Sequence, residues 1–172
     1  MDRLLSLSFL LACLCNLSAA ATVANVTPRD AWMDQVVQGH NTQRALYGAP
    51  ALTWNANLYQ GTQDWANQCR FQHSGGNYGE NLAVGTGDFT FDSGLKLWMD
   101  EAAKYDYNHP GFSPETGHFT QVVWKSTTSV ACAIADCPAG TIFDQESHYL
   151  VCRYDPPGNF EGQFEENVGR HV

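Results

Sequence analysis

Two histidines and two glutamates are candidates for chemistry in this sequence: His73, Glu80, Glu101 and His118. Imidazole nitrogens can bind a divalent metal such as Zn²⁺, and nearby carboxylates can orient the imidazole rings or act as general bases. The four residues are far apart in the chain, so their spacing alone does not join them into one site. Taken singly, a histidine beside an aromatic residue is typical of a hydrogen-bonded structural residue, and a lone glutamate is typical of a solvated one.

Nucleophilic catalysis has less support in the sequence. Ser74 follows His73 directly, but adjacency in sequence does not place a base within hydrogen-bonding reach of the hydroxyl. The chain contains neither an H-E-x-x-H metalloprotease motif nor a G-x-S-x-G nucleophile motif. We therefore expect a protein that is not an enzyme, with a metal-dependent hydrolase as the less favoured alternative.

The elements that must position these side chains are expected to form one domain. The chain has 172 residues, a net charge of −9 and 44% hydrophobic residues, which is enough apolar material for a packed core. The acidic excess argues against nucleic acid or an anionic membrane surface as a partner, because both bind clustered lysine and arginine. No apolar run reaches the length of a membrane span. We expect a monomer without stable membrane insertion.

The first 20 residues predict a secretory signal peptide. Arg3 precedes an apolar run from Leu4 to Leu17, and the small residues Ala19, Ala20 and Ala21 suit cleavage by signal peptidase. The mature protein is therefore expected outside the cell. In the short N-terminal segment 21–27, Asn25 begins an Asn-Val-Thr sequence and is a predicted glycosylation site.

Four cysteines remain after removal of the signal peptide: Cys69, Cys132, Cys137 and Cys152. An even number of cysteines in a secreted chain indicates two disulfides, and the sequence leaves all three pairings open. A zinc site is the competing interpretation, but the chain offers no second cysteine pair with a spacing like that of Cys132 and Cys137.

Hydrophobic periodicity predicts helices in the first half of the domain and strands in the second half. This order is typical of an α+β fold. We assign residues 28–160 to the domain and 161–172 to an acidic, loosely held C-terminal tail. The expected helices are 28–47, Asn55–Cys69 and Phe91–Tyr105, and the expected strands are Phe119–Trp124, Ser129–Ala135 and His148–Tyr154.

A series of longer motifs occurs in order along the chain. They are His40-Asn41-x-x-Arg44, His73-Ser74 followed by Tyr78-Gly79-Glu80-Asn81-Leu82, Gly117-His118-Phe119-Thr120-Gln121-Val122-Val123-Trp124, and Tyr154-Asp155-Pro156-Pro157-Gly158-Asn159. Together they resemble the CAP superfamily, which comprises cysteine-rich secretory proteins, antigen 5 and pathogenesis-related class 1 proteins. The segment from Lys104 to His118 is most similar to the fungal Pry-type sterol-binding secreted proteins.

This resemblance implies a three-layer α-β-α sandwich with a central antiparallel sheet and two disulfides, Cys69–Cys132 and Cys137–Cys152. It also implies that the two histidines and two glutamates named above meet in a central cleft that holds Zn²⁺ or another divalent metal. With only two imidazoles we expect that binding to be weak. His40 matches a structural motif of the family, and we interpret it as a core or capping residue.

The resemblance further implies that sterols, fatty acids or other small hydrophobic compounds bind near the loop between Glu101 and His118. The candidate loop residues are Tyr105, Tyr107, Phe112 and Phe119, since aromatic rings can cover an apolar ring system and tyrosine hydroxyls can meet its polar end. Without the resemblance, the same aromatic residues would be interpreted as ordinary core packing. The expected activity is the binding and export of such compounds.

A pathogenesis-related defence or virulence factor, acting by signalling or antimicrobial activity, is the alternative. Plant relatives release a C-terminal peptide after a Cys-x-Tyr-Asp step, which Cys152-Arg153-Tyr154-Asp155 matches. The chain then continues differently from the plant peptide, and a strand end followed by a tight turn explains the same residues.

Overall fold

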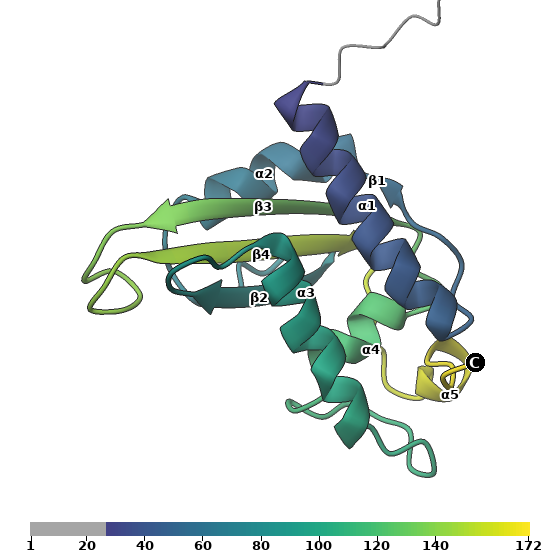
Figure 1. Cartoon of the computed structure of the whole chain (residues 1–172). Helices are drawn as coiled ribbons and strands as arrows, with labels where there is room; N and C mark the ends of the chain where they lie inside the picture. The colour runs from purple at the N-terminus through teal and green to yellow at the C-terminus, as the bar shows by residue number, and fades with distance from the viewer. Residues whose placement is uncertain (1–26) are drawn as a thin grey trace, which may run out of the picture.

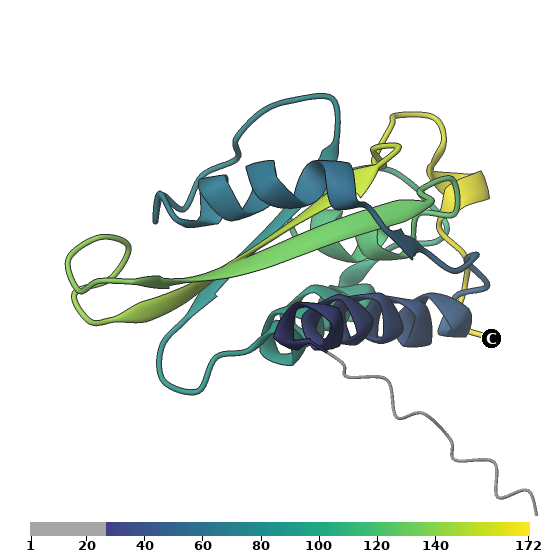
Figure 2. The ribbon, with the colours of Figure 1, turned by 90° about the horizontal axis from the view of Figure 1, so that it is seen from above.

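A mixed sheet lies between two layers of helices in the computed structural model, which describes residues 27–172. The helix α2 (Ala56–Ala66) covers one face, and α1 (Pro28–Leu46), α3 (Phe91–Asp100) and α4 (Gly117–Val123) cover the other (Figures 1 and 2). This confirms the α+β three-layer prediction. The predicted signal peptide and Asn25 lie outside the described residues. None of the helices in residues 27–172 is long and apolar enough to cross a membrane.

The starts of the helices follow directly from local sequence. Thr27 caps α1 through its side chain, Pro28 occupies the first helical position, and Asp30 completes a capping box. Asn55 and Thr90 cap α2 and α3 in the same way, each accepting a hydrogen bond from a backbone N–H of the first turn. The three predicted helices are therefore confirmed, with α2 three residues shorter at its C-terminal end than expected and α3 continued by a 3₁₀ turn, η1 (Glu101–Lys104).

The sheet has the strand order β1-β3-β4-β2. The strands β3 (Ser129–Cys137) and β4 (Ser147–Asp155) form a long antiparallel hairpin, and β2 (Gly79–Gly85) pairs antiparallel with β4. The two-residue strand β1 (Thr53–Trp54) is parallel to β3, so the sheet is mixed, whereas an antiparallel sheet was expected. The sequence prediction located β3 and β4 but missed β1 and β2.

Residues Phe119–Val123 are helical and Trp124 is the C-cap of that helix, so the predicted strand Phe119–Trp124 is wrong. The helix α4 is buried from Phe119 to Val123, so its sequence lacks the repeat of apolar residues every three to four positions that marks an amphipathic helix. The N-terminus of α4 is fixed by Glu101, whose Oε2 accepts the backbone N–H groups of His118 and Phe119 at 3.0 Å each. Such a long-range cap is invisible in local sequence.

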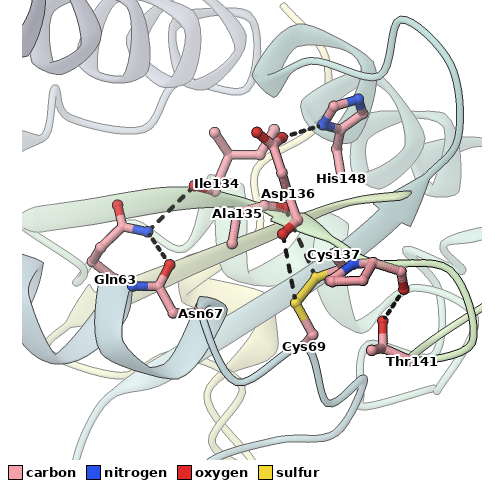
Figure 3. Close-up of a disulfide and its surroundings, with 10 residues drawn as sticks. Gln63, Asn67, Cys69, Ile134, Ala135, Asp136, Cys137, Thr141 and His148 are labelled. Atoms are coloured by element: carbon pink, nitrogen blue, oxygen red, sulfur yellow. Dashed lines mark hydrogen bonds and ion pairs between the residues drawn. A yellow bond between two sulfur atoms is a disulfide. The ribbon is translucent and has the colours of Figure 1, made fainter. Parts of the chain in front are cut away.

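The disulfides join Cys69 to Cys137 and Cys132 to Cys152, which corrects both expected pairings. Cys132 and Cys152 lie directly opposite each other on β3 and β4, so the register of the hairpin decides this pair. Cys69 follows α2 and meets Cys137 at the end of β3 (Figure 3). The Cys69–Cys137 disulfide therefore links the end of α2 to the sheet.

The C-terminal tail is packed against the domain, contrary to the loosely held tail that we expected. It forms a short helix, α5 (Phe164–Asn167), in which Phe164 and Asn167 are 1% exposed. Phe164 packs edge-on against Trp124 at 5.1 Å between ring centroids. The tail is therefore part of the folded unit.

Candidate functional site

A cleft of about 220 Å³ brings together the two histidines predicted to form a site. Its lining residues come from the loop before β2, from β2, from the loop before α4 and α4 itself, and from the segment after β4. They are His73, Glu80, Asn81, Phe112, Pro114, Gly117, His118 and Asn159. Glu101 lies behind His118 and contacts it directly. The sequence-predicted set of four therefore converges in one place.

His73 and Glu80 form one imidazole–carboxylate pair. The Nδ1 atom of His73 lies 3.1 Å from Glu80 Oε1, which also accepts the backbone N–H of Ser74 at 2.9 Å. The other oxygen, Oε2, accepts hydrogen bonds from the Ser74 hydroxyl and from Arg153 Nε. The Glu80 side chain is only 5% exposed, whereas the His73 side chain is 64% exposed.

The electrostatics of this pair follow from its hydrogen bonds. Burial alone would raise the pKa of Glu80, but hydrogen bonds from His73, Ser74 and Arg153 outweigh burial and lower the pKa to about 2. The hydrogen bond to Glu80 raises the pKa of His73, against the smaller opposing effect of burial. Glu80 is therefore an anion at neutral pH, and each of its two carboxylate oxygens already has two hydrogen-bond partners.

His118 and Glu101 form the second pair, on different supports. The Nδ1 atom of His118 lies 2.6 Å from Glu101 Oε1, and Glu101 Oε2 caps α4 as described above. The His118 ring stacks on Trp98 at 6.1 Å between centroids, and Asn81 Nδ2 donates to its backbone carbonyl at 3.0 Å. These contacts hold the ring between the α3 and β2 sides of the cleft.

The arrangement leaves one nitrogen of each imidazole available. Both Nδ1 atoms face carboxylates, and within residues 27–172 neither Nε2 atom takes part in a hydrogen bond. A neutral imidazole that donates Nδ1–H to a carboxylate presents its Nε2 lone pair to a ligand. The two glutamates are occupied by donors, so they orient the rings and are poorly placed to coordinate an ion themselves.

A second cluster of metal-type residues lies in the core and is unsuited to an ion. His40, Cys132 and Cys152 come within 4.8 Å of one another. The two cysteines are joined to each other, and His40 contacts Val36 O through Nδ1 and the Tyr154 hydroxyl through Nε2. His40 is 0% exposed, which agrees with the structural role expected for it.

The predicted aromatic loop divides into a buried and an exposed part. Tyr105 and Phe119 are 8% and 0% exposed and pack on each other at 5.8 Å between ring centroids. These two residues are therefore part of the hydrophobic core. Tyr107 is half-buried and donates its hydroxyl hydrogen to Gly169 O. Phe112 is 53% exposed and lies against Gly117 at the cleft. Of the four rings, Phe112 is the one open to an external ligand.

Sequence reasoning missed a groove between α1 and α3 that, at about 520 Å³, has a larger volume than the histidine cleft. Leu46, Leu95 and Met99 supply apolar surface, and Lys96 and Asp100 form an ion pair of 2.6 Å beside it. The helices approach closely where a Cβ on Gly39 would come within 2.7 Å of the Phe91 ring. A glycine facing an aromatic residue of a helix that follows much later in the chain gives no local signal.

The family of the chain is shown by comparison with known proteins. The family model described as "CAP: Cysteine-rich secretory protein family" matches residues 37–154. The chain belongs to this family. It is 47% identical over 136 residues to "Secreted protein RBT4" of Candida albicans and 41% identical over 138 residues to "Protein PRY2" of Saccharomyces cerevisiae. These alignments cover 74% and 77% of the chain but only 36% and 40% of the two relatives.

A plant relative is matched over most of its length. "Pathogenesis-related protein 1A" of Nicotiana tabacum is 40% identical over 134 residues, which is 74% of the chain and 76% of the relative. The CAP fold is also found in solved structures. NaASP2 with Zn²⁺ has a TM-score of 0.66 at 22% identity over 86% of the chain and 90% of that structure. MpPR-1i has a TM-score of 0.64 at 22% identity over 78% and 93%.

Proposed function

We propose that this CAP protein binds sterols and related small apolar molecules outside the cell, with the loop 105–116 as the contact for a sterol. The observation that carries the proposal is Phe112, a large aromatic side chain of this loop that is 53% exposed, whereas Tyr105 of the same loop and Phe119 of α4 are buried. An exposed aromatic ring suits a flat apolar partner. The resemblance of the segment from Lys104 to His118 to the fungal Pry-type sterol-binding proteins supports the same assignment.

The volume of the histidine cleft indicates that the sterol and the metal ion bind at different places. The histidine cleft, at about 220 Å³, is smaller than the roughly 300–1,000 Å³ typical of sites for drug-sized ligands. It suits an ion with its water molecules. A sterol body must therefore lie outside it, on the loop surface beside Phe112.

The groove between α1 and α3 favours a second ligand class, the fatty acids. Its volume of about 520 Å³ lies in the usual range for organic ligands. Its apolar residues suit an acyl chain, and the Lys96 ammonium group beside them could pair with a carboxylate in place of Asp100. Loss of palmitate binding in Met99→Trp, with sterol binding retained, would separate this site from the loop.

The sterol assignment is tested by removing the exposed ring. Phe112→Ala should abolish most cholesterol or ergosterol binding in a fluorescence assay without lowering the midpoint of thermal unfolding, because the Phe112 ring is largely outside the core. Phe143→Ala is the matched control, since Phe143 is 41% exposed on the β3–β4 hairpin, away from the loop (Figure 1). Native-like sterol binding by Phe112→Ala would refute the loop as the contact.

A weakly bound divalent metal in the cleft is the second part of the proposal. The Nε2 atoms of His73 and His118 would hold Zn²⁺, with water completing the coordination. The related NaASP2 was crystallised with Zn²⁺, which supports the choice of ion. Titration of Zn²⁺ into chelator-treated protein tests this assignment, and His118→Ala should lose the binding.

We propose binding in preference to catalysis. A carboxylate with a pKa of about 2 is a poor general base at neutral pH, which disfavours Glu80 in that role. The Ser74 hydroxyl is directed to Glu80, while His73 uses Nδ1 for the same carboxylate, so Ser74 lacks an imidazole partner for activation. Metal-dependent cleavage of a peptide library, lost in His118→Ala, would revive the hydrolase.

Secretion and a monomeric state belong to the same proposal. N-terminal sequencing of protein from the medium should begin near Ala21, and the elution volume of the protein should match one chain. For the alternative role as a defence or virulence factor, release of a peptide after Asp155 would remove Phe164 and Asn167 from the core, which disfavours that route.

A further inference from the structure

Arg153 lies under the His73 side of the cleft and contacts the carboxylate that orients this histidine. Arg153 on β4 and Glu80 on β2 are directly opposite each other in the sheet. The Arg153 Nε atom donates to Glu80 Oε2 at 3.1 Å, and Nη2 donates to the Ser74 hydroxyl at 2.8 Å. Ser74 in turn donates to the same Oε2 atom. The Arg153 guanidinium is therefore one of the two side-chain donors to Glu80 Oε2, and it also holds the other donor, the Ser74 hydroxyl, in place.

The guanidinium is itself held on both sides. The Arg153 side chain is 7% exposed, and its Cζ lies 4.4 Å from the centroid of the Tyr78 ring. On α2, a Cβ added at Gly61 would come within 3.1 Å of Arg153 Nη1, so the helix passes close to the guanidinium at a residue without a side chain. The Tyr78 hydroxyl is tied to the turn by donation to Gly75 O at 2.6 Å. Arg153 therefore has little freedom to move.

The two imidazole–carboxylate pairs of the cleft differ in this support. Glu101, which faces His118, has its second oxygen bound by two backbone N–H groups of α4. Glu80, which faces His73, has its second oxygen bound by the side chains of Ser74 and Arg153. Within residues 27–172, Arg153 is the charged donor of the two. A substitution at position 153 should consequently affect one histidine and spare the other.

We propose that Arg153 is a positioning residue for metal binding by His73. By holding Oε2 of Glu80, it keeps Oε1 on Nδ1 of His73 and so keeps Nε2 directed into the cleft. The planar guanidinium donates to Glu80 and Ser74 from two different nitrogens held in a fixed geometry. A lysine ammonium group would have to reach both acceptors from a single nitrogen on a flexible stem, so it should hold Glu80 less firmly. This inference rests on the proposed metal site.

The test compares the native full-length protein with Arg153→Lys and Arg153→Met. Calorimetric titration with Zn²⁺ gives the affinity, and ¹⁵N NMR of the imidazole nitrogens gives the tautomers of His73 and His118 in the metal-free protein at one fixed pH. Both variants should bind Zn²⁺ about tenfold more weakly, the usual effect of losing an outer partner of a metal-binding histidine. His73 should change from one Nδ1–H tautomer to a mixture, and His118 should keep its native spectrum.

The design separates positioning from loss of fold. Arg153→Lys keeps a buried cation beside Glu80, and an unchanged His118 spectrum shows that the cleft is intact. Zn²⁺ affinity within about twofold of native in both variants, or weakened binding with a native His73 tautomer, would overturn the proposal. If the native protein binds no Zn²⁺, the proposed metal site fails, and the His73 tautomer still decides whether Arg153 orients the ring.

Discussion

His40 and Arg44 are polar residues of α1 with 0% exposure, and both are fully used by the fold. The Arg44 guanidinium donates to the carbonyl oxygens of Pro50, Val122, Trp124 and Thr127 at 2.7–3.0 Å. His40 sits one turn earlier, between Val36 O and the Tyr154 hydroxyl. The motif that contains both residues thus joins α1 to the loops around α4 and to β4.

The buried His40 should make stability depend on pH. Burial lowers the pKa of His40 from 6.5 to about 4, so the unfolded chain gains a proton at a higher pH than the folded chain. The resulting stability is complete above pH 6.5 and is lost as the pH falls to about 4. We expect a loss of about 3 kcal/mol from this group over that window.

Urea unfolding of the native protein and His40→Gln across this range measures the effect. The difference in unfolding free energy between the two proteins should shrink as the pH falls, because glutamine carries no proton that burial opposes. The exposed His109 provides the control, and His109→Gln should follow the native curve. Parallel native and His40→Gln curves would contradict the assignment.

At the scale of elements, side chains protect the outer edge of β3 beyond the two-residue β1. Asn55 N–H reaches Val130 O, and then Trp32 Nε1 donates to Cys132 O at 2.8 Å and Gln63 Nε2 to Ile134 O at 3.3 Å. Unpaired carbonyls on an edge strand would otherwise invite pairing with another chain. The helices α1 and α2 therefore close the sheet with two polar side-chain atoms.

Trp32→Phe should destabilise the protein by about 1–2 kcal/mol, because it leaves the carbonyl of the buried Cys132 without its donor while keeping most of the ring. Chemical unfolding measures the change. Trp65→Phe is the matched control, since Trp65 Nε1 donates to Gln72 O in an exposed loop where water can replace it. Equal effects of the two substitutions would show that the edge carbonyl is not special.

The success of sequence prediction varied with how local the determinants were. Hydrophobic periodicity located α1 to α3, and the family motifs identified the residues of the cleft. The helix α4 depends on Glu101, which lies 17 residues before His118, and the pairing of Cys132 with Cys152 depends on hairpin register. Neither is written in any short segment.

The same limit applies to the aromatic loop. Tyr105, Phe112 and Phe119 are alike in residue type, and only the packing of the whole domain decides which ring faces solvent. The contribution of Arg153 was also hidden, because its partner Glu80 becomes its neighbour only when β2 and β4 pair.

At the scale of the molecule, the C-terminal segment 164–172 holds several loops against the core. Asn167 accepts the backbone N–H and the hydroxyl of Ser126, and its own carbonyl accepts Lys125 N–H. Farther on, Arg170 lies 4.7 Å above the Tyr107 ring, and Val172 N–H reaches Leu46 O. The segment therefore connects the end of α1, the turn after α4 and the aromatic loop.

Phe164→Ala should cost about 3–5 kcal/mol of unfolding free energy, as expected for an aromatic side chain deleted from a well-packed core. The midpoint of urea unfolding, followed by tryptophan fluorescence, measures this loss. Phe160→Ala serves as the control, because Phe160 is 49% exposed and should change stability by less than about 0.5 kcal/mol. Similar stabilities of the two variants would restore the view of a loosely held tail.

The alternation along β4 has a practical consequence for protein engineering. Three successive residues of this strand make three different contacts: Cys152 forms the disulfide with Cys132, Arg153 donates to Glu80 at the cleft, and Tyr154 contacts His40. One residue inserted earlier in β4 would turn each of these side chains to the opposite face of the sheet and break all three contacts. The bend 139–145 ahead of this strand carries none of these duties and projects from the body of the protein (Figures 1 and 2). An affinity tag or a dye grafted there should leave the disulfide, the Arg153–Glu80 ion pair and the Tyr154–His40 contact intact.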